Sequence, residues 1–367
     1  MNKIYVNPNN KSALTFELLA LENDKNVRSI LFFMADENKY PSEEITPLLK
    51  KITKPIIGGI FPELIFNGER KKEGIVLIPL SFTLTTQLID LSLTSEKIFK
   101  QLQITQHQST QANSCLFVFL DAFSNGKEVL LETLFNFFGI NPTYIGGGAG
   151  SLSFNQFPCI INNTGIHENA AVIGWANKQI NIGVAHGWES ISNPLKVTET
   201  SQNKIKSINW KPAFQVYKEI VEHHSGKKFN ETNFFDIAKS YPFGISKIDE
   251  EKVVRDPFKT TKNSIHFIDY IPEGAYVEIL HGNIKSLLKG AEIAKEKANI
   301  QNLITKTETL FCIDCISRVL YLNDNLQKEL NIVSKHSKAT GIFSIGEIAN
   351  SESIVEIYNK TIVTALW

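Results

Sequence analysis

Blocks of apolar and polar residues along the chain predict three segments with the same order of elements. In the first segment, an apolar strand at residues 30–34 precedes a helix at 41–51, which opens with proline, serine and two glutamates. A strand that ends in a glycine turn follows at 55–59, and another strand occupies 75–78. We interpret this order as a β-α-β-turn-β unit.

Two later segments repeat this order. The second has a strand at 115–120, a helix at 128–138 that Gly139 ends, a glycine turn at 146–150 and a strand at 170–175. The third has a strand at 309–313, a helix at 316–330, a strand at 341–345, a turn at 346–347 and a strand at 361–365. The repeat is too irregular for a solenoid, so we expect related units packed into shared sheets.

A different pattern lies between the second and third units. Residues 211–226 predict an amphipathic helix that begins near Pro212 and ends at Gly226. Alternating residues predict strands at 264–270 and 275–280 with a Pro-Glu-Gly turn between them, and a helix follows at 286–299. The predicted fold class is therefore α+β, with mixed β-sheets flanked by helices.

Composition narrows the classes of function. The 367 residues contain 38 Lys plus Arg and 38 Asp plus Glu, and this zero net charge argues against a nucleic-acid partner. Four cysteines are too few for a disulfide scaffold, and the first residues lack the apolar core of a signal peptide. No apolar run is long enough to span a bilayer. We expect a cytoplasmic protein with no membrane partner.

The segment from Gly146 to Gly150 has four glycines in five positions, with weaker echoes at 55–59 and 341–347. Its backbone N–H groups could bind an anion, but a tight bend between closely packed strands explains the same residues. Both interpretations stay open. The spacing does not match a dinucleotide fingerprint, and the lysine of a P-loop is missing.

Cys312 and Cys315 form a C-x-x-C motif at a strand-to-helix junction. A thiol at such a junction can be acidic enough for redox chemistry. The surroundings do not match thioredoxin, and no second C-x-x-C would complete a zinc site. Packing or pocket lining is the favoured interpretation, and redox activity stays open.

Several charged and polar residues could bind a ligand or serve only the structure. Arg318 could grip a ligand carboxylate, or it could pair on a helix surface with Asp314, four residues earlier. Arg255 could act in the same way, but ordering its own loop is the simpler interpretation. Glu347 could accept an ammonium group that Asn359 helps to position, or both could satisfy a β-turn.

The histidines and nucleophiles suggest no catalytic set. His186 fits a core or strand-edge position. His223 and His224 point about 100° apart on a helix, so they do not form a metal site. No G-x-S-x-G motif or catalytic triad is found. We therefore expect no catalytic residue, no metal and no cofactor.

The order of short motifs resembles the FIST (F-box and intracellular signal transduction) sensory proteins. The N-terminal motifs are Gly146-Gly-Gly-Ala-Gly150, Val197-Thr-Glu-Thr200 and Lys211-Pro-Ala-Phe214. The C-terminal motifs are Tyr241-Pro-Phe-Gly244, Val254-Arg-Asp-Pro257, Ile271-Pro-Glu-Gly274, Cys315-Ile-Ser-Arg318, Gly346-Glu-Ile348 and Asn359-Lys-Thr361. The resemblance implies a FIST N-terminal domain at 25–215 and a FIST C-terminal domain at 216–367, in a free-standing form. Ser151 stands where the family pattern has an acidic residue.

The resemblance implies an intracellular sensor of a small molecule, with amino acids or related metabolites as the proposed ligands. Its pocket is expected where the glycine turns meet the C-terminal part. The expected partners are this ligand and a separate signalling protein. The predicted ligand-binding residues are Gly146, Gly147, Gly148, Ser151, Arg255, Cys315, Arg318, Glu347, Asn359 and Thr361. An enzyme that uses Cys315 and a protein–protein adaptor are the alternatives.

Overall fold

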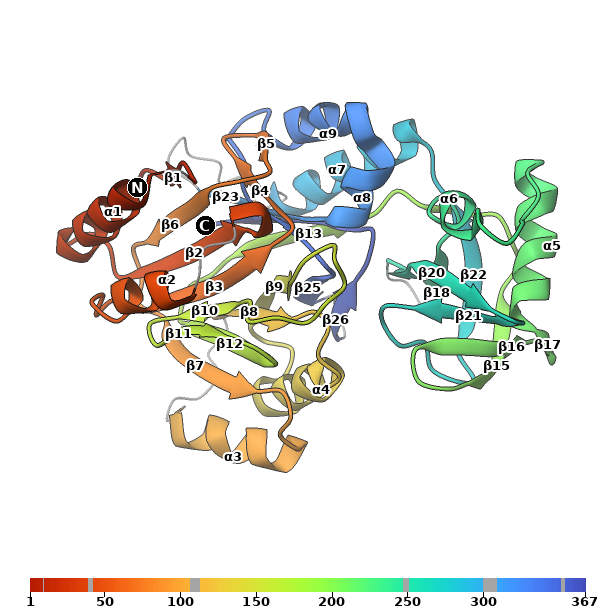
Figure 1. Ribbon diagram of the computed structural model, residues 1–367, viewed down its shortest axis with the longest axis horizontal. Helices are drawn as coiled ribbons and strands as arrows, with labels where there is room; N and C mark the ends of the chain where they lie inside the picture. The colour runs from red at the N-terminus through yellow and green to blue at the C-terminus, as the bar shows by residue number, and fades with distance from the viewer. Residues whose placement is uncertain (9, 39–41, 106–112, 247–250, 300–308, 351–353) are drawn as a thin grey trace.

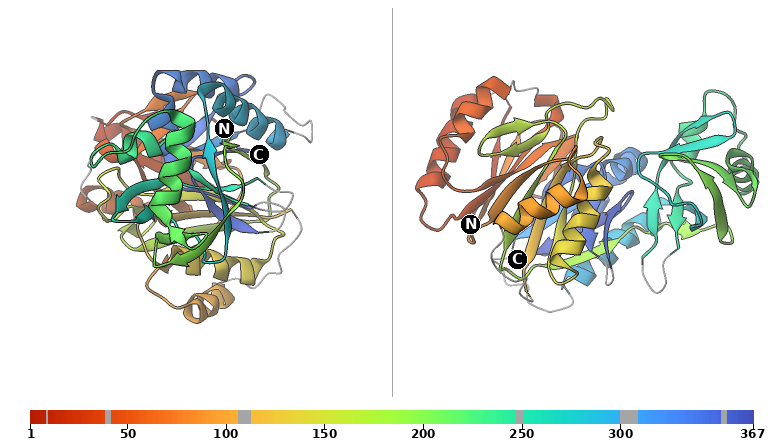
Figure 2. Two further views of the ribbon diagram at one scale, coloured as in Figure 1. Left: turned by 90° about the vertical axis from the view of Figure 1, so that its right-hand side faces the viewer. Right: turned by 90° about the horizontal axis from the view of Figure 1, so that it is seen from below.

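The computed structural model describes residues 1–8, 10–38, 42–105, 113–246, 251–299, 309–350 and 354–367. Among these residues, three six-stranded sheets with their helices form a body, and a fourth sheet with two helices forms a smaller lobe (Figure 1). The lobe comprises residues 189–281, and the view from below in Figure 2 shows it at one end of the body. Mixed sheets flanked by helices confirm the predicted α+β class.

The three sheets of the body share one strand order: an edge strand, an antiparallel strand, a central strand, a parallel strand and a hairpin. The first contains β1 (Ile4–Val6), β6 (Ile75–Leu80), β2 (Ser29–Ala35), β3 (Ile56–Phe61), β10 (Ile160–Asn162) and β11 (Gly165–His167). The second contains β7 (Thr85–Asp90), β12 (Ala170–Ala176), β8 (Cys115–Asp121), β9 (Thr143–Ala149), β25 (Glu347–Asn350) and β26 (Val355–Tyr358). The third contains β13 (Asn181–Ala185), β27 (Ile362–Leu366), β23 (Leu310–Cys315), β24 (Thr340–Ser344), β4 (Glu63–Phe66) and β5 (Glu69–Lys71).

The hairpin in each sheet comes from a different unit than the central and parallel strands of that sheet. The hairpin β4–β5 follows β3 along the chain but pairs with β24. In the same way, β10–β11 follows β9 but pairs with β3, and β25–β26 follows β24 but pairs with β9. The three predicted units are therefore present, and they exchange hairpins in a cycle that holds the sheets together.

The glycine segments predicted as turns at 55–59 and 146–150 lie in strands, so those two predictions were wrong, whereas the strand predicted at 341–345 and the turn predicted at Gly346 are present. Gly58, Gly146 and Gly341 occupy the same position in the three parallel strands. A Cβ on these glycines would lie 1.8, 1.7 and 1.8 Å, respectively, from the carbonyl oxygen of the partner residue in the central strand. The missing side chain is needed for this close approach inside the sheet. The chain turns later, at Gly150 (φ +148°) and Gly346 (φ +89°).

Helices cover the outer face of each sheet. The first sheet carries α1 (Lys11–Asn23) and α2 (Ser42–Leu49), the second α3 (Ser95–Thr105) and α4 (Lys127–Phe138), and the third α7 (Ile284–Asn299), α8 (Ile316–Leu322) and α9 (Leu326–Val333). Short 3₁₀ turns are η1 (Asp36–Asn38) and η2 (Asn323–Asn325). The single helix predicted at 316–330 is thus two helices, because Asn323 adopts a positive φ of +45° between them.

The inner faces of the sheets meet in one aromatic core. The Phe33 ring lies 5.7 Å from Phe61, 5.2 Å from Phe119 and 5.5 Å from Phe311 between centroids. These four rings come from all three units, so the units share one inner core and are not three stacked repeats.

The lobe has its own sheet and core. Its strands, in order, are β19 (Val253–Arg255), β18 (Phe243–Ile245), β22 (Tyr276–His281), β15 (Leu195–Thr200), β16 (Lys204–Ile208), β21 (Ser264–Phe267) and β20 (Pro257–Thr261), with β14 (Glu189–Ser190) on β22 and β17 (Lys211–Pro212) on β16. They are covered by α5 (Ala213–Ser225), which ends at Gly226 as predicted, and by α6 (Phe234–Ala238). The predicted domain boundary between residues 215 and 216 stays a proposal about the sequence. It does not coincide with the division into body and lobe, because strands β23–β27 follow it in the chain but belong to the body.

Replacing Gly146 with alanine should destabilise the protein by more than about 3 kcal/mol, because the added methyl group meets backbone that cannot move away. Gly226→Ala is the matched control: nothing lies near its missing Cβ, so only its left-handed backbone (φ +70°) is strained, at a cost of about 1 kcal/mol. Urea unfolding measures both. Equal losses would contradict the close-approach explanation.

Candidate functional site

The turn of the third unit lies directly on the glycine strand of the second. The N–H of Gly148 donates to the carbonyl of Gly346 over 2.9 Å, and the N–H of Ile345 donates back to Gly148 over 2.9 Å. A Cβ at Gly148 would lie 2.1 Å from the carbonyl oxygen of Ile345. In the adjoining ladder, Gly147 pairs with Glu347. The predicted glycines and Glu347 are therefore neighbours, as expected, but through strand pairing.

Glu347 is fully buried beside this turn. The Ser344 hydroxyl donates to its Oε1 over 2.8 Å, and the N–H of Thr361 donates to its Oε2 over 3.3 Å. Burial raises the pKa of Glu347 to about 8, so the carboxyl group is mostly protonated at neutral pH. The Thr361 hydroxyl donates to the carbonyl of Asn359 over 2.8 Å. Glu347 and Thr361 thus fix the loop that carries Asn359.

Arg318 is fully buried in a network of its own. Its Nε forms an ion pair with Asp314 (3.2 Å), and its Nη2 bonds Glu329. Its remaining N–H groups donate to the carbonyls of His186 (2.6 Å), Lys360 (3.3 Å) and Leu287 (3.1 Å). The pair with Asp314 predicted from spacing is present, but it is buried rather than exposed. These contacts favour a structural role, and carboxylate binding by Arg318 stays a prediction.

All four cysteines are free and buried. Burial raises the pKa of the Cys312 and Cys315 thiols well above the ordinary value, which disfavours a thiolate nucleophile at neutral pH. Cys312 belongs to the hydrophobic core under the third sheet, whereas Cys315 reaches a cavity. The arrangement agrees with packing and pocket lining.

Ser151 orders the loop that follows the glycine strand. Its hydroxyl accepts the N–H of Ser153 over 3.1 Å, and its carbonyl accepts the N–H of Phe154 over 3.2 Å. Phe154 adopts a positive φ of +58°, a conformation that is rare for a bulky residue. The loop thereby presents the Phe154 ring at the boundary between body and lobe.

A cavity of about 40 Å³ lies at this boundary. The residues that line it come from the body and the lobe: Leu152, Phe154, Phe235, Asp256, Phe258, Ile268, Cys315, Ile316, Ser317, Leu320, Ile345, Gly346 and Asn359. Five of its apolar side chains, at positions 152, 154, 235, 258 and 320, are between 36% and 55% exposed. Cys315 and Asn359 are the predicted site residues among them.

The cavity adjoins a larger cleft of about 940 Å³, and Phe154, Phe258 and Ile268 line both. The cleft continues along the start of α4, around Lys127, and along the lobe segment 201–204. Cavity and cleft together form a site between body and lobe, narrow and apolar at one end and wider and more polar at the other.

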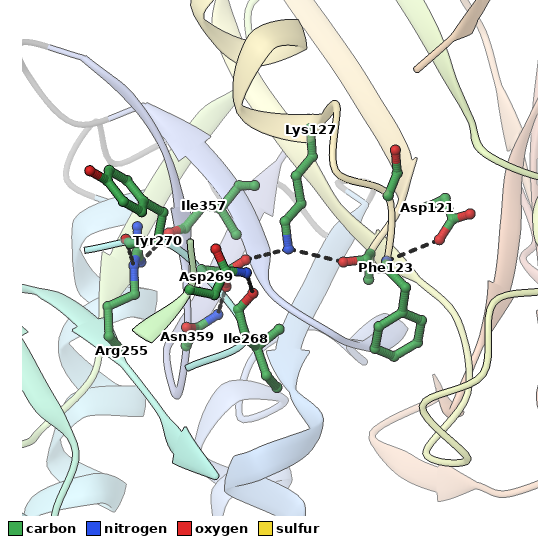
Figure 3. A network of polar contacts seen from close by, with 12 residues as sticks. Asp121, Phe123, Lys127, Arg255, Ile268, Asp269, Tyr270, Ile357 and Asn359 are labelled. Carbon is green, nitrogen blue, oxygen red and sulfur yellow. Dashed lines mark hydrogen bonds and ion pairs between the residues drawn. The ribbon is translucent and has the colours of Figure 1, made fainter. Parts of the chain in front are cut away.

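Buried polar contacts join the lobe to the body beside this site (Figure 3). The Lys127 ammonium bonds the Asp269 carboxylate over 2.5 Å and the carbonyl of Ala122 over 2.9 Å. Asn359 donates its amide to the same carboxylate over 2.6 Å. Lys127 holds the pKa of Asp269 down against the effect of burial, so this carboxylate stays charged.

Two further contacts cross the same boundary. Arg255, from the lobe, donates to the carbonyl of Ile357 in the body over 2.7 Å, and also to the carbonyl of Tyr270 over 3.1 Å. Lys360, from the body, pairs with Asp256 of the lobe over 3.1 Å. Arg255 therefore orders its surroundings, and it lines a separate pocket of about 290 Å³ together with Tyr270 and Glu356.

The sequence interpretation missed several residues at this site. Asp256 and Lys360 are neighbours of the selected Arg255 and Asn359, so the motifs pointed within one residue of them. Phe154 and Phe258 carried no signal, because exposed aromatic residues look like core residues in a sequence without an alignment. Lys127 and Asp269 are far apart in the chain, and only folding brings them together.

Comparison with known families identifies the chain. A model of the FIST N domain matches residues 29–211, and a model of the FIST C domain matches residues 213–350. This chain belongs to the FIST family. FIST domains are sensory domains of signal transduction, which confirms the broad functional prediction. A search of curated proteins found no match.

The two FIST matches meet between β17 and α5, inside the lobe. The cavity of this FIST protein is therefore lined from both matched regions, with Phe154 from the first and Asp256 and Cys315 from the second. Within the described ranges, no helix is long and apolar enough to cross a membrane.

Arg318→Ala should destabilise the protein by about 3–5 kcal/mol, because it leaves Asp314 and Glu329 buried without their cation. Lys100→Ala, which removes an exposed pair with Glu96, is the control and should change stability by less than about 1 kcal/mol. Chemical unfolding measures both. An Arg318→Ala protein as stable as the control would show that the buried network is not structural.

Glu347 should make stability fall as pH rises. Between the ordinary pKa of 4.5 and the folded value of about 8, the folded protein holds a proton that the unfolded chain has lost. The free energy of unfolding then falls by at most about 1.4 kcal/mol per pH unit across this window. Glu347→Gln cannot titrate and should lack this slope.

The measurement is the difference in unfolding free energy between wild type and Glu347→Gln from pH 5 to 8. His186, whose pKa burial lowers to about 4, makes stability rise with pH below about 6.5, but it does so in both proteins and cancels. A difference that is independent of pH would show that Glu347 is ionised in the folded protein.

Proposed function

We propose that this FIST protein is a sensor that binds a small molecule between the body and the lobe, with an amino acid or related metabolite as the ligand class. The observation that carries the proposal is the narrow cavity with five exposed apolar side chains around it. Exposed apolar groups that gather around a hollow mark binding sites in soluble proteins, whereas scattered ones are ordinary.

The position of the cavity supports a sensory role. Phe154 and Leu320 belong to the body, and Phe235 and Phe258 belong to the lobe, so a bound molecule contacts both. A ligand shifts a conformational equilibrium only when it binds one arrangement more tightly than another. A ligand held between body and lobe favours the arrangement in which both surround it, and a separate signalling protein can read that arrangement.

The predicted site residues take different parts in this proposal. Cys315 and Asn359 line the cavity and would contact the ligand. Gly148, Glu347 and Thr361 lie behind the cavity and position its turn and loop. Because its N–H groups are engaged in the buried network, Arg318 would support the site rather than bind a ligand carboxylate.

A protein–protein adaptor is the second candidate, and the same exposed side chains favour it. An apolar segment of another protein could cover Phe154, Phe235 and Phe258 as a small molecule would. The two candidates differ in size of partner: a sensor is stabilised by a metabolite alone, whereas an adaptor is stabilised only by a peptide or protein.

Thermal unfolding in the presence of a metabolite library tests the proposal. A ligand at 100 times its dissociation constant adds about 2.7 kcal/mol to the stability of the native state. Phe258→Ala should weaken the binding of any hit at least about tenfold, since it removes about 1.4 kcal/mol or more of contact. Trp210→Ala removes a more exposed aromatic ring of the lobe outside the cavity and should leave binding unchanged.

Failure of every metabolite to raise the melting temperature would count against a small-molecule sensor. Hits whose affinity is the same in wild type and Phe258→Ala would place the binding site elsewhere on the protein.

A further inference from the structure

Two residues that line the narrow cavity each carry a buried hydrogen-bond acceptor that has no partner among the described atoms. The two acceptors are Oδ1 of Asp256 and Oδ1 of Asn359. Asp256 is 4% exposed and Asn359 is 5% exposed. A buried acceptor without a donor lowers the stability of the protein by about 1–3 kcal/mol, or by more if it is charged. A ligand that supplies a donor to both acceptors would therefore gain binding free energy.

The orientation of the Asn359 amide is fixed by its neighbours. Its nitrogen donates to the Asp269 carboxylate over 2.6 Å and to the carbonyl of Tyr358 over 3.1 Å. Neither of these groups can donate in return while Asp269 is ionised, and Lys127 keeps it so. The amide oxygen must therefore be the free atom, and it can only accept a hydrogen bond.

One of the two oxygens of the Asp256 carboxylate has a partner. Its Oδ2 lies 3.1 Å from the Lys360 ammonium, which also donates to the carbonyl of Lys239 over 3.0 Å and lies 5.2 Å from the centre of the Trp188 ring. Lys360 is thus held by these contacts, and it is not among the residues described as lining the cavity. Oδ1 of Asp256, by contrast, has no partner among the described atoms.

Charge and shape select the kind of donor. Asp256 is the charged residue among those described as lining the cavity, and Lys360, which pairs with its Oδ2, is not among them. The volume of about 40 Å³ holds a few water-sized groups, enough for a head group but not for a whole metabolite. The body of a ligand would extend between Phe154 and Phe258 into the larger cleft.

We propose that the cavity binds the protonated primary amine of a ligand with an apolar body, and that its ammonium group donates to Asp256 and Asn359. Hydrogen bonds from a cation to a carboxylate are about twice as strong as neutral ones, and the aromatic rim adds attraction for a cation. This inference rests on the proposed function and gives its ligand a head group. It assigns to Asp256 and Asn359 the ammonium contact that the sequence suggested for Glu347.

The same contact links the two parts of the molecule. Asp256 belongs to the lobe and Asn359 to the body, so an ammonium group that bonds both acts as a bridge. The bridge is made only when lobe and body stand close enough to share the donor. Binding is thereby coupled to the position of the lobe.

Calorimetric titration of the full chain with two matched probes tests the inference. The probes are 2-phenylethylamine, a primary ammonium with three N–H donors, and N,N,N-trimethyl-2-phenylethylammonium, which has the same ring and charge but no N–H donor. We expect the primary amine to bind at least tenfold more tightly. This comparison uses the wild-type protein, so it does not depend on the folding of any variant.

Asp256→Asn should weaken binding of 2-phenylethylamine at least tenfold, because it removes the charged acceptor and keeps the shape of the side chain. Asp324→Asn, on an exposed 3₁₀ turn away from the cavity, is the matched control and should not change the affinity. A melting curve of each variant shows that the native fold is retained before titration.

Three results would overturn the inference: equal binding of the two probes, no binding of either, or an affinity that Asp256→Asn leaves unchanged. Water would then be the donor to the two acceptors. The proposed function is judged separately, by whether any metabolite stabilises the protein in a manner that Phe258→Ala weakens. An uncharged metabolite that passes this second test would support the sensor and refute the amine site.

Discussion

The closest backbone contacts in this protein, between each central strand and its parallel neighbour, are the constraint on which the rest depends. At Gly58, Gly146 and Gly341 the neighbouring carbonyl oxygen lies where a Cβ would be, so the three units accept only glycine there. The chain can then leave each parallel strand and add a hairpin to the next sheet. Because the exchange is cyclic, no unit is complete alone, and the three inner faces share one aromatic core.

The site between body and lobe is a consequence of this exchange. The hairpin of the third unit pairs with the second sheet, so the turn at Gly346 lies on Gly148. For the same reason, the loop that carries Asn359 faces the lobe. The polar contacts of Lys127 and Lys360 then hold the lobe across a boundary where Val253 and Val254 of the lobe also join the apolar clusters of the body. Relative movement is the default expectation for domains whose interface is not large and hydrophobic throughout.

The sequence predicted the local elements well because their signals are local. The strand at 115–120, the helix that Gly139 ends and the helix that Gly226 ends all follow from apolar spacing and end residues. It failed at the glycine segments 55–59 and 146–150, because a turn and a close strand contact require the same absence of a side chain. The exchange of hairpins could not be predicted, since nothing in the linear pattern says which sheet a hairpin joins. Within the site, Cys315 and Asn359 were found through short motifs, whereas the aromatic rim and the Lys127–Asp269 pair depend on long-range contacts.

We propose that the ligand site of this FIST protein lies between body and lobe, at the cavity lined by Phe154, Phe258 and Asn359. Crystallographic screening of the protein with a library of small fragments tests it most directly. The account predicts that bound fragments gather in this cavity and the adjoining cleft, and that those with an amine place it against Asp256 and Asn359. Fragments that bind only elsewhere, such as the pocket beside Arg255 and Glu356, would contradict it.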